Sequence, residues 1–266
     1  MKTKFILASL FAVVLFSSCS HNNDDPGVDN SPPTTFLPLT NGNYWVYDVD
    51  NGGTISRDSL YISHDTIINS VTYKKMKTLA APTGFFSSTL KDNGVKIDGS
   101  KLEMTGNFSI NFGLTSPINL SLTDFVFFKE NAAVNEVLST TSGTINQTVQ
   151  TYPLTIDYTL KTVCDGSLAN YLSSNGDMYT DVKKTKVVLN LKITTTQVVS
   201  GITVPITIMN AQDVVTSTQY YSKNIGMFYA NTLINYQLNS IPGVTLPIPS
   251  SQTATQQEFL SNYHLN

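Results

Sequence analysis

Short runs of alternating apolar and polar residues recur along the chain from Phe36 to its C-terminus. The clearest is Lys183–Thr196, in which every other residue from Val187 to Ile193 is apolar and the residues between are mostly polar. A period of two places successive side chains on opposite faces of a strand, so this segment has one apolar face. Similar runs, rich in aromatic and β-branched residues, cover 43–49, 54–62, 152–163, 203–209, 214–221 and 226–238. No amphipathic helix of ten or more residues stands out, although Ser167–Ser173 could form one or two helical turns.

Turn dipeptides separate many of these runs. Asn51-Gly52 and Asn175-Gly176 each precede a β-rich run, and Asn93-Gly94 lies between Phe85–Lys91 and Val95–Asp98. Asn-Gly is a strong hairpin signal, because both turn residues need positive φ. The pattern predicts an all-β fold with a single antiparallel domain, built as a strongly curved sheet, a barrel or a sandwich. These three architectures stay open at this point.

The 266 residues suit one large all-β domain or two smaller ones, but no second linker divides 36–266 and no internal repeat of fixed period is evident. The proline-rich stretch Ser240–Ser251 predicts an extended crossing segment rather than a domain boundary. We therefore expect one extracytoplasmic domain over 36–266.

The N-terminus has the pattern of an export signal. Lys2 and Lys4 precede Phe5–Phe16, which is apolar except for Ser9. This run is shorter than the roughly 20 apolar residues that a membrane-spanning helix needs, and it fits the apolar core of a secretory signal. The stretch Leu15-Phe16-Ser17-Ser18-Cys19 resembles a bacterial lipobox, although Phe16 stands where Leu is commoner. The resemblance implies a signal peptide at 1–18, cleavage before Cys19 and lipid on the thiol of Cys19.

Residues 19–35 are polar, contain proline and glycine, and predict a disordered tether. Asp24-Asp25 resembles the export signal of surface lipoproteins in Bacteroidota. The resemblance implies an outer-membrane lipoprotein that faces the periplasm or the cell surface, with the surface slightly favoured.

Two further blocks carry a resemblance. Phe36-Leu37-Pro38-Leu39, followed by Gly42-Asn43-Tyr44-Trp45-Val46-Tyr47, is similar to the opening of many uncharacterised Bacteroidota lipoproteins. Asn224-Ile225-Gly226-Met227 resembles a later block of the same group. The group implies an extracytoplasmic β-rich module and no particular reaction.

Charge is sparse along the chain. Only 13% of residues are charged, and the net charge of −3 becomes −5 once the two lysines of 1–18 are removed. No basic stripe is present, so the sequence predicts no binding of nucleic acid.

Three aromatic residues are candidates for ligand binding. On the predicted strand 43–49, Trp45 and Tyr47 share one face and Tyr44 lies on the other. They could form a platform for carbohydrate, whereas the default interpretation of Trp45 is a core side chain.

Candidate catalytic and metal-binding residues are few. His64, at an apparent turn, and Cys164, at the end of an apolar run, would have to meet in the fold to serve a hydrolase. The simpler interpretation is that His64 faces solvent and that Cys164 is part-buried and inert. Asp48–Gly53 begins like a calcium loop but lacks two of its oxygen donors, and a hairpin turn explains it. We predict no catalytic residue, no metal site and no cofactor.

Two triplets, Asp58-Ser59-Leu60 and Asp65-Thr66-Ile67, resemble the O-glycosylation acceptor of Bacteroidota, which makes Ser59 and Thr66 candidate acceptors. The sequence as a whole predicts a lipid-anchored extracytoplasmic binding or assembly module without catalytic activity. Its partners would be the membrane, through Cys19, and a glycan, a protein or an apolar ligand. The alternatives are a carrier of an apolar ligand in a β cavity and a hydrolase of unknown substrate.

Overall fold

The computed structural model describes residues 33–112, 117–199, 201–241 and 246–266. Cys19, the predicted signal peptide and most of the predicted tether lie outside these residues. The first half of the sheet consists of β1 Tyr44–Asp50, β2 Ile55–Ile68, β3 Val71–Thr78, β4 Gly94–Asp98, β5 Lys101–Ile110 and β6 Ile118–Lys129. The second half consists of β7 Val137–Val149, β8 Tyr152–Leu172, β9 Met178–Val199, β10 Ile202–Ser222, β11 Gly226–Gln237 and β12 Ser251–His264. One short helix, α1 Phe85–Leu90, lies between β3 and β4 in the chain.

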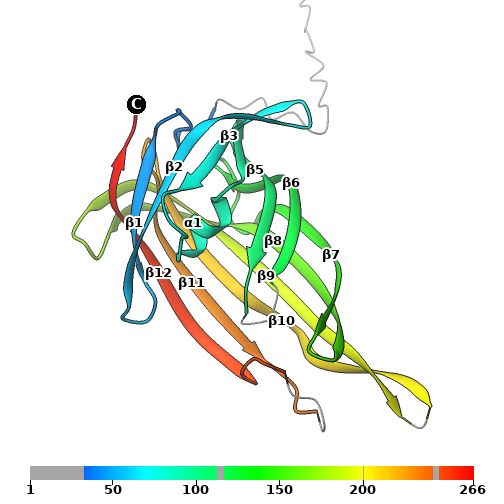
Figure 1. Cartoon of the computed structure of the whole chain (residues 1–266). Helices are drawn as coiled ribbons and strands as arrows, with labels where there is room; N and C mark the ends of the chain where they lie inside the picture. Colours follow the sequence, from blue (N-terminus) through cyan, green and yellow to red (C-terminus); the bar gives the residue numbers. More distant parts are fainter. Residues whose placement is uncertain (1–32, 113–116, 200, 242–245) are drawn as a thin grey trace, which may run out of the picture.

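All twelve strands belong to one antiparallel sheet in which most neighbours in sequence are neighbours in space. The pairing of β1 with β12 joins the two halves, so the edges of the sheet are β6 and β7. The sheet curls until these edges approach, which gives a nearly closed barrel (Figure 1). Where β6 meets β8, the hydroxyl of Thr162 donates to the carbonyl of Val126 at 2.5 Å. The predicted all-β antiparallel domain is confirmed, and the barrel is the architecture it adopts.

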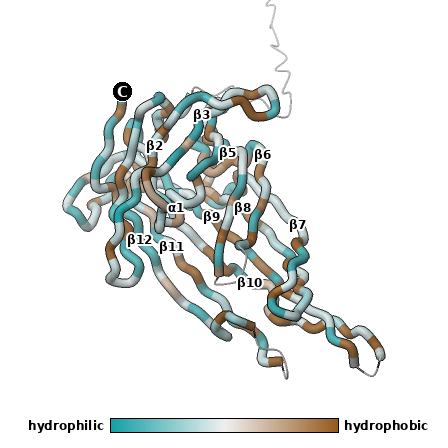
Figure 2. Tube along the Cα trace, viewed as in Figure 1, coloured by the Kyte–Doolittle hydropathy of each residue, from teal (hydrophilic) through white to brown (hydrophobic). Residues whose placement is uncertain are grey.

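Hydrophobic and hydrophilic residues alternate along many of the strands (Figure 2), and this alternation sets which side chains enter the barrel. On β1, Trp45, Tyr47 and Val49 are buried, while Tyr44 and Val46 face outward and are half-buried. On β9, the apolar positions from Val187 to Ile193 are all buried. The period-two pattern of Lys183–Thr196 therefore predicted the inward face of this strand correctly.

Large side chains fill the barrel. The bulkiest buried ones are aromatic and include Trp45, Tyr47, Tyr221, Phe36, Phe86 and Phe128. Helix α1 lies inside, and the ring of Phe86 packs edge-on against both Tyr47 and Tyr221. The helix is thus part of the core, and it belongs to the connection between the paired strands β3 and β4 (Figure 1).

Three local predictions were wrong. Phe85–Lys91, expected as a strand of a hairpin, contains α1, because buried side chains bind the backbone amides at its start. Ser167–Ser173, considered for helical turns, continues β8 and pairs with β9 up to Leu172. His64 lies inside the long β2 rather than at a turn, next to a register shift opposite β3.

Within the described residues, no helix has the length and apolar character required to cross a membrane.

Candidate functional site

The three candidate aromatic residues on β1 separate into two environments. Trp45 and Tyr47 are fully buried. The indole nitrogen of Trp45 donates to the carbonyl of Ile225 at 2.6 Å, and the hydroxyl of Tyr47 donates to the carbonyl of Met227 at 2.9 Å. Both polar groups are therefore satisfied inside the protein, and neither ring can reach a ligand in solvent. Of the predicted platform, only Tyr44 remains on the outer surface.

Tyr44 lines a hollow on the outside of the barrel. The hollow has a volume of about 270 Å³. We call it the tyrosine hollow, and it is lined by Gly42, Tyr44, Val46, Ser59, Tyr61 and Leu79. Leu79 is 79% exposed and adds apolar surface that is open to water.

The register of three strand pairs aligns the side chains of this hollow. Tyr44 is the cross-strand partner of Tyr61 on β2 and of His264 on β12, and Tyr61 is in turn the partner of Lys77 on β3. Directly paired residues lie on the same face of a sheet. His264, Tyr44, Tyr61 and Lys77 therefore form one row across four strands.

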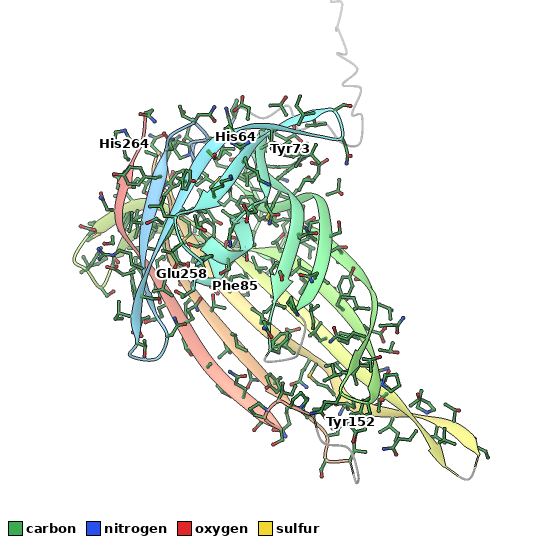
Figure 3. The ribbon with its side chains drawn as sticks, viewed as in Figure 1. His64, Tyr73, Phe85, Tyr152, Glu258 and His264 are labelled. Carbon is green, nitrogen blue, oxygen red and sulfur yellow. The ribbon has the colours of Figure 1, made fainter. Side chains whose placement is uncertain are left out.

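The ring of Tyr44 is held from one side. It stacks on the His264 ring with centroids 5.8 Å apart and an interplanar angle of 22°. His264 in turn lies 3.1 Å from the side-chain oxygen of Asn266 through its Nε2 atom. The C-terminal residues thus support the tyrosine and leave its other side to the hollow, near the end of the barrel where Figure 3 labels His264.

The predicted glycosylation acceptors fall in different places. Ser59 is half-buried and lines the tyrosine hollow beside Tyr44, so the structure brings these two candidate residues together. Thr66 is also half-buried and lies further along β2, opposite Tyr73 of β3. Glycosylation of either residue remains a prediction.

A buried polar cluster that the sequence analysis missed holds the start of α1. The carboxylate of Asp58 accepts from the amides of Thr83 and Gly84, and Glu258 Oε1 accepts from the amide of Phe86 at 2.7 Å. The side-chain oxygen of Gln256 accepts from Phe85 at 2.6 Å. These groups satisfy the amides that a helix start leaves without partners. Figure 3 places Phe85 and Glu258 side by side in the barrel.

Glu258 is the most perturbed acid in this cluster. It is fully buried, and burial raises the pKa of its carboxyl to about 7, with the nearby Asp58 charge adding to the effect and the amide of Phe86 opposing it. Its second oxygen, Oε2, has no hydrogen-bond partner. Gly84 is required here, because a Cβ at that position would lie 2.2 Å from this oxygen.

A second polar cluster braces the outer wall. Lys96 Nζ lies 2.9 Å from Asp124 and 3.2 Å from Glu103, and the hydroxyl of Tyr73 donates to Asp124 at 2.5 Å. Its charged groups are paired with one another. We interpret it as a tie between β3, β4, β5 and β6.

The residues considered for a hydrolase do not meet. His64 is exposed and contacts the hydroxyl of Ser63, whereas Cys164 is buried, with its sulfur 3.6 Å from the carbonyl of Ala132. Five strands separate β2 from β8 in the sheet. The candidate calcium loop is a turn, in which Asp48 binds Arg57 and Asp50 accepts from the amide of Gly53.

The interior offers little room for a ligand. Two apolar cavities in the described core, one beneath α1 and one near Tyr236, have volumes of about 20 Å³ each. Ligand pockets usually measure roughly 300–1,000 Å³, so the geometry does not support a carrier with an enclosed cavity. An opening of about 430 Å³ lies between Ile241 and Leu246, but the connection between these residues is outside the described part of the chain.

Comparisons with known proteins give one structural likeness. No family model matches the chain, and no curated protein matches it. The structure is similar to the crystal structure of a predicted lipoprotein from Parabacteroides distasonis, at 14% identity and a TM-score of 0.41. The alignment covers 87% of this chain and 99% of the other.

Proposed function

We propose that this protein is a lipid-anchored, extracytoplasmic binding module without catalytic activity, and that its ligand occupies the tyrosine hollow. The observation that carries the proposal is the hollow itself, in which Tyr44, Tyr61 and the exposed Leu79 present apolar surface on an outer wall. Ligand sites are typically concave and mostly apolar, with a few polar groups, and the tyrosine hollow has this character.

The lipobox resemblance around Cys19 supports the same role. A chain held at a membrane by lipid on Cys19, through a polar tether, would keep its outer wall free for a partner. The proposed location is the outer membrane, with the domain on the periplasmic side or at the cell surface and the surface slightly favoured. No observation in the described residues favours the hydrolase or the carrier over this function.

The anchor is tested by labelling the full-length chain in a Gram-negative host with an alkyne fatty acid. We expect incorporation in the wild type and in Cys164→Ala, and none in Cys19→Ala, which should also leave the membrane fraction. Protease treatment of intact cells would then decide between surface and periplasm. Labelling of Cys19→Ala at the wild-type level would contradict the proposal.

The hollow is tested separately with fluorinated tyrosine and ¹⁹F NMR. The signals of Tyr44 and Tyr61, assigned by substitution with phenylalanine, are followed during titration with oligosaccharides, peptides and fatty acids. We expect one class to shift these two signals and not that of Tyr152, which lies at the opposite end of the barrel (Figure 3). If no class shifts them, the hollow is not the binding site.

A further inference from the structure

We propose that the tyrosine hollow binds a glycan that carries carboxylate groups, with sugar rings stacked on Tyr44 and Tyr61 and an acidic group paired with Lys77. This inference rests on the proposed function, because it names the ligand class of the same site. It is carried by the order of the side chains along the row and by the charge at one end of it.

The row has the dimensions of a small extended ligand. Tyr44, Tyr61 and Lys77 are cross-strand partners on β1, β2 and β3. Neighbouring strands lie about 4.8 Å apart, so the three side chains rise from a line about 10 Å long. A protein partner would cover roughly 20–30 residues of this surface, whereas only Gly42, Tyr44, Val46, Ser59, Tyr61 and Leu79 line the hollow.

The walls combine ring faces with polar groups. An aromatic ring has a negative face, and the C–H groups on one side of a sugar ring are apolar with a slight positive charge. Ser59 adds a hydroxyl within the hollow, and Val46 and Leu79 add apolar contact. A purely apolar ligand fits less well, because the hollow is open to water and part of such a ligand would stay exposed.

Lys77 supplies the preference for an acidic ligand. Some outer-wall lysines are neutralised, for example Lys74 by Asp65 at 2.5 Å and Lys186 by Asp165 at 2.7 Å. Lys77, like Lys192 on β9, has no ion-pair partner in the part of the chain that the structure describes. What distinguishes Lys77 is its place at the end of the tyrosine row, opposite Tyr61. A cation without a partner beside two tyrosines complements a carboxylate that arrives with the ligand.

The test is calorimetric titration of the full-length chain in detergent with acidic hexasaccharides. The probes are hexagalacturonate, hexamannuronate and a heparin-derived hexasaccharide, and fully methyl-esterified hexagalacturonate is the uncharged match of the first. We expect at least one acidic probe to bind. Tyr44→Ala and Tyr61→Ala should each weaken its binding by about tenfold or more.

The charge is tested by Lys77→Gln. We expect this change to weaken an acidic probe several-fold and to leave the methyl ester unaffected. Lys192→Gln removes an exposed lysine of β9 outside the row and should change nothing. Tyr152→Ala is the control for loss of a tyrosine, and fluorescence of the buried Trp45 verifies that every variant is folded.

Two results would overturn the inference. One is the absence of binding by every acidic probe at millimolar concentration, and the other is equal binding of acid and methyl ester with no effect of Lys77→Gln. If the NMR titration responds to peptides or fatty acids but not to these probes, the hollow remains a binding site and only the ligand class is wrong. If neither experiment responds, the proposed binding function fails as well.

Discussion

At the scale of single residues, the direction in which a side chain points decides what it can do. Trp45 and Tyr44 are adjacent in sequence but point to opposite faces of the sheet. Trp45 is buried in the core, where its indole N–H donates a hydrogen bond to the carbonyl of Ile225, whereas Tyr44 lies on the outer wall beside Ser59. Glu258 shows the same effect for charge. It points inward from β12, so its carboxylate meets the amide of Phe86 and the charge of Asp58 instead of water.

Glu258 predicts that stability depends on pH. Because its pKa is raised from 4.5 to about 7 in the folded state, the folded protein holds a proton that the unfolded chain loses between these values. The free energy of unfolding should therefore fall by about 2–4 kcal/mol as pH rises from about 4.5 to about 7. Above pH 7, the titration of Glu258 should change it little further. Urea unfolding at pH 5 and pH 8 measures this difference.

Glu258→Gln isolates the contribution of this carboxyl group. The amide keeps an oxygen for Phe86 and carries no charge, so the difference between pH 5 and pH 8 should shrink by the same amount. Glu130→Gln, at the start of the turn between β6 and β7, should preserve it. An unchanged difference in Glu258→Gln would show that Glu258 does not titrate in this range.

At the scale of elements, α1 and β7 show what local sequence leaves open. The segment Phe85–Leu90 has a composition that suits a strand, and it becomes a helix because Asp58, Gln256 and Glu258 occupy its first amides. Two of these three groups come from β12, at the other end of the chain. Helix propensity within the segment carries no information about them, which is why the prediction failed.

The strand β7 is an edge, and the direction of its amides can be worked out. An antiparallel ladder alternates between hydrogen-bonded pairs, which exchange two backbone hydrogen bonds, and non-hydrogen-bonded pairs. Pro153 of β8 has no N–H, so its pair with Thr148 of β7 is of the non-hydrogen-bonded type. Pairs alternate between the two types, and the register has no shift from Ser139 to Val149. Thr141 therefore donates toward β8, whereas the amide of Thr140 points to the open side.

The adjacent residues Thr140 and Thr141 of β7 should therefore differ in how well they tolerate substitution by proline. Thr140→Pro removes an amide that the β7–β8 ladder does not use, whereas Thr141→Pro removes a bond to Leu160. We expect Thr141→Pro to lower the free energy of unfolding by about 2 kcal/mol more than Thr140→Pro, as measured by urea unfolding. Equal losses would mean that the amide directions are assigned incorrectly.

At the scale of the whole molecule, the barrel is a packed solid rather than a container. The N-terminal residues Phe36 and Leu37, helix α1 and the inward aromatic side chains together fill its described interior. An enclosed ligand would have to displace these groups. Function is therefore expected on the outer wall.

The single tryptophan reports on this packing. Trp45 has no solvent-accessible surface, so its fluorescence should be blue-shifted and resist quenching by acrylamide until the barrel unfolds. The expected result is a quenching constant several-fold lower in the native protein than in urea. Strong quenching of the native protein would contradict a filled core.

The sequence by itself determined the all-β class and the inward faces of strands such as β1 and β9. These follow from local patterns, since a period of two and an Asn-Gly turn act over a few residues. Only the tertiary structure decided that the sheet closes through β1 and β12, that Glu258 binds the start of α1, and that Tyr44, Tyr61 and Lys77 share a row. The reason is physical. Each of these depends on register between segments far apart in the chain, which the residues of either segment alone do not specify.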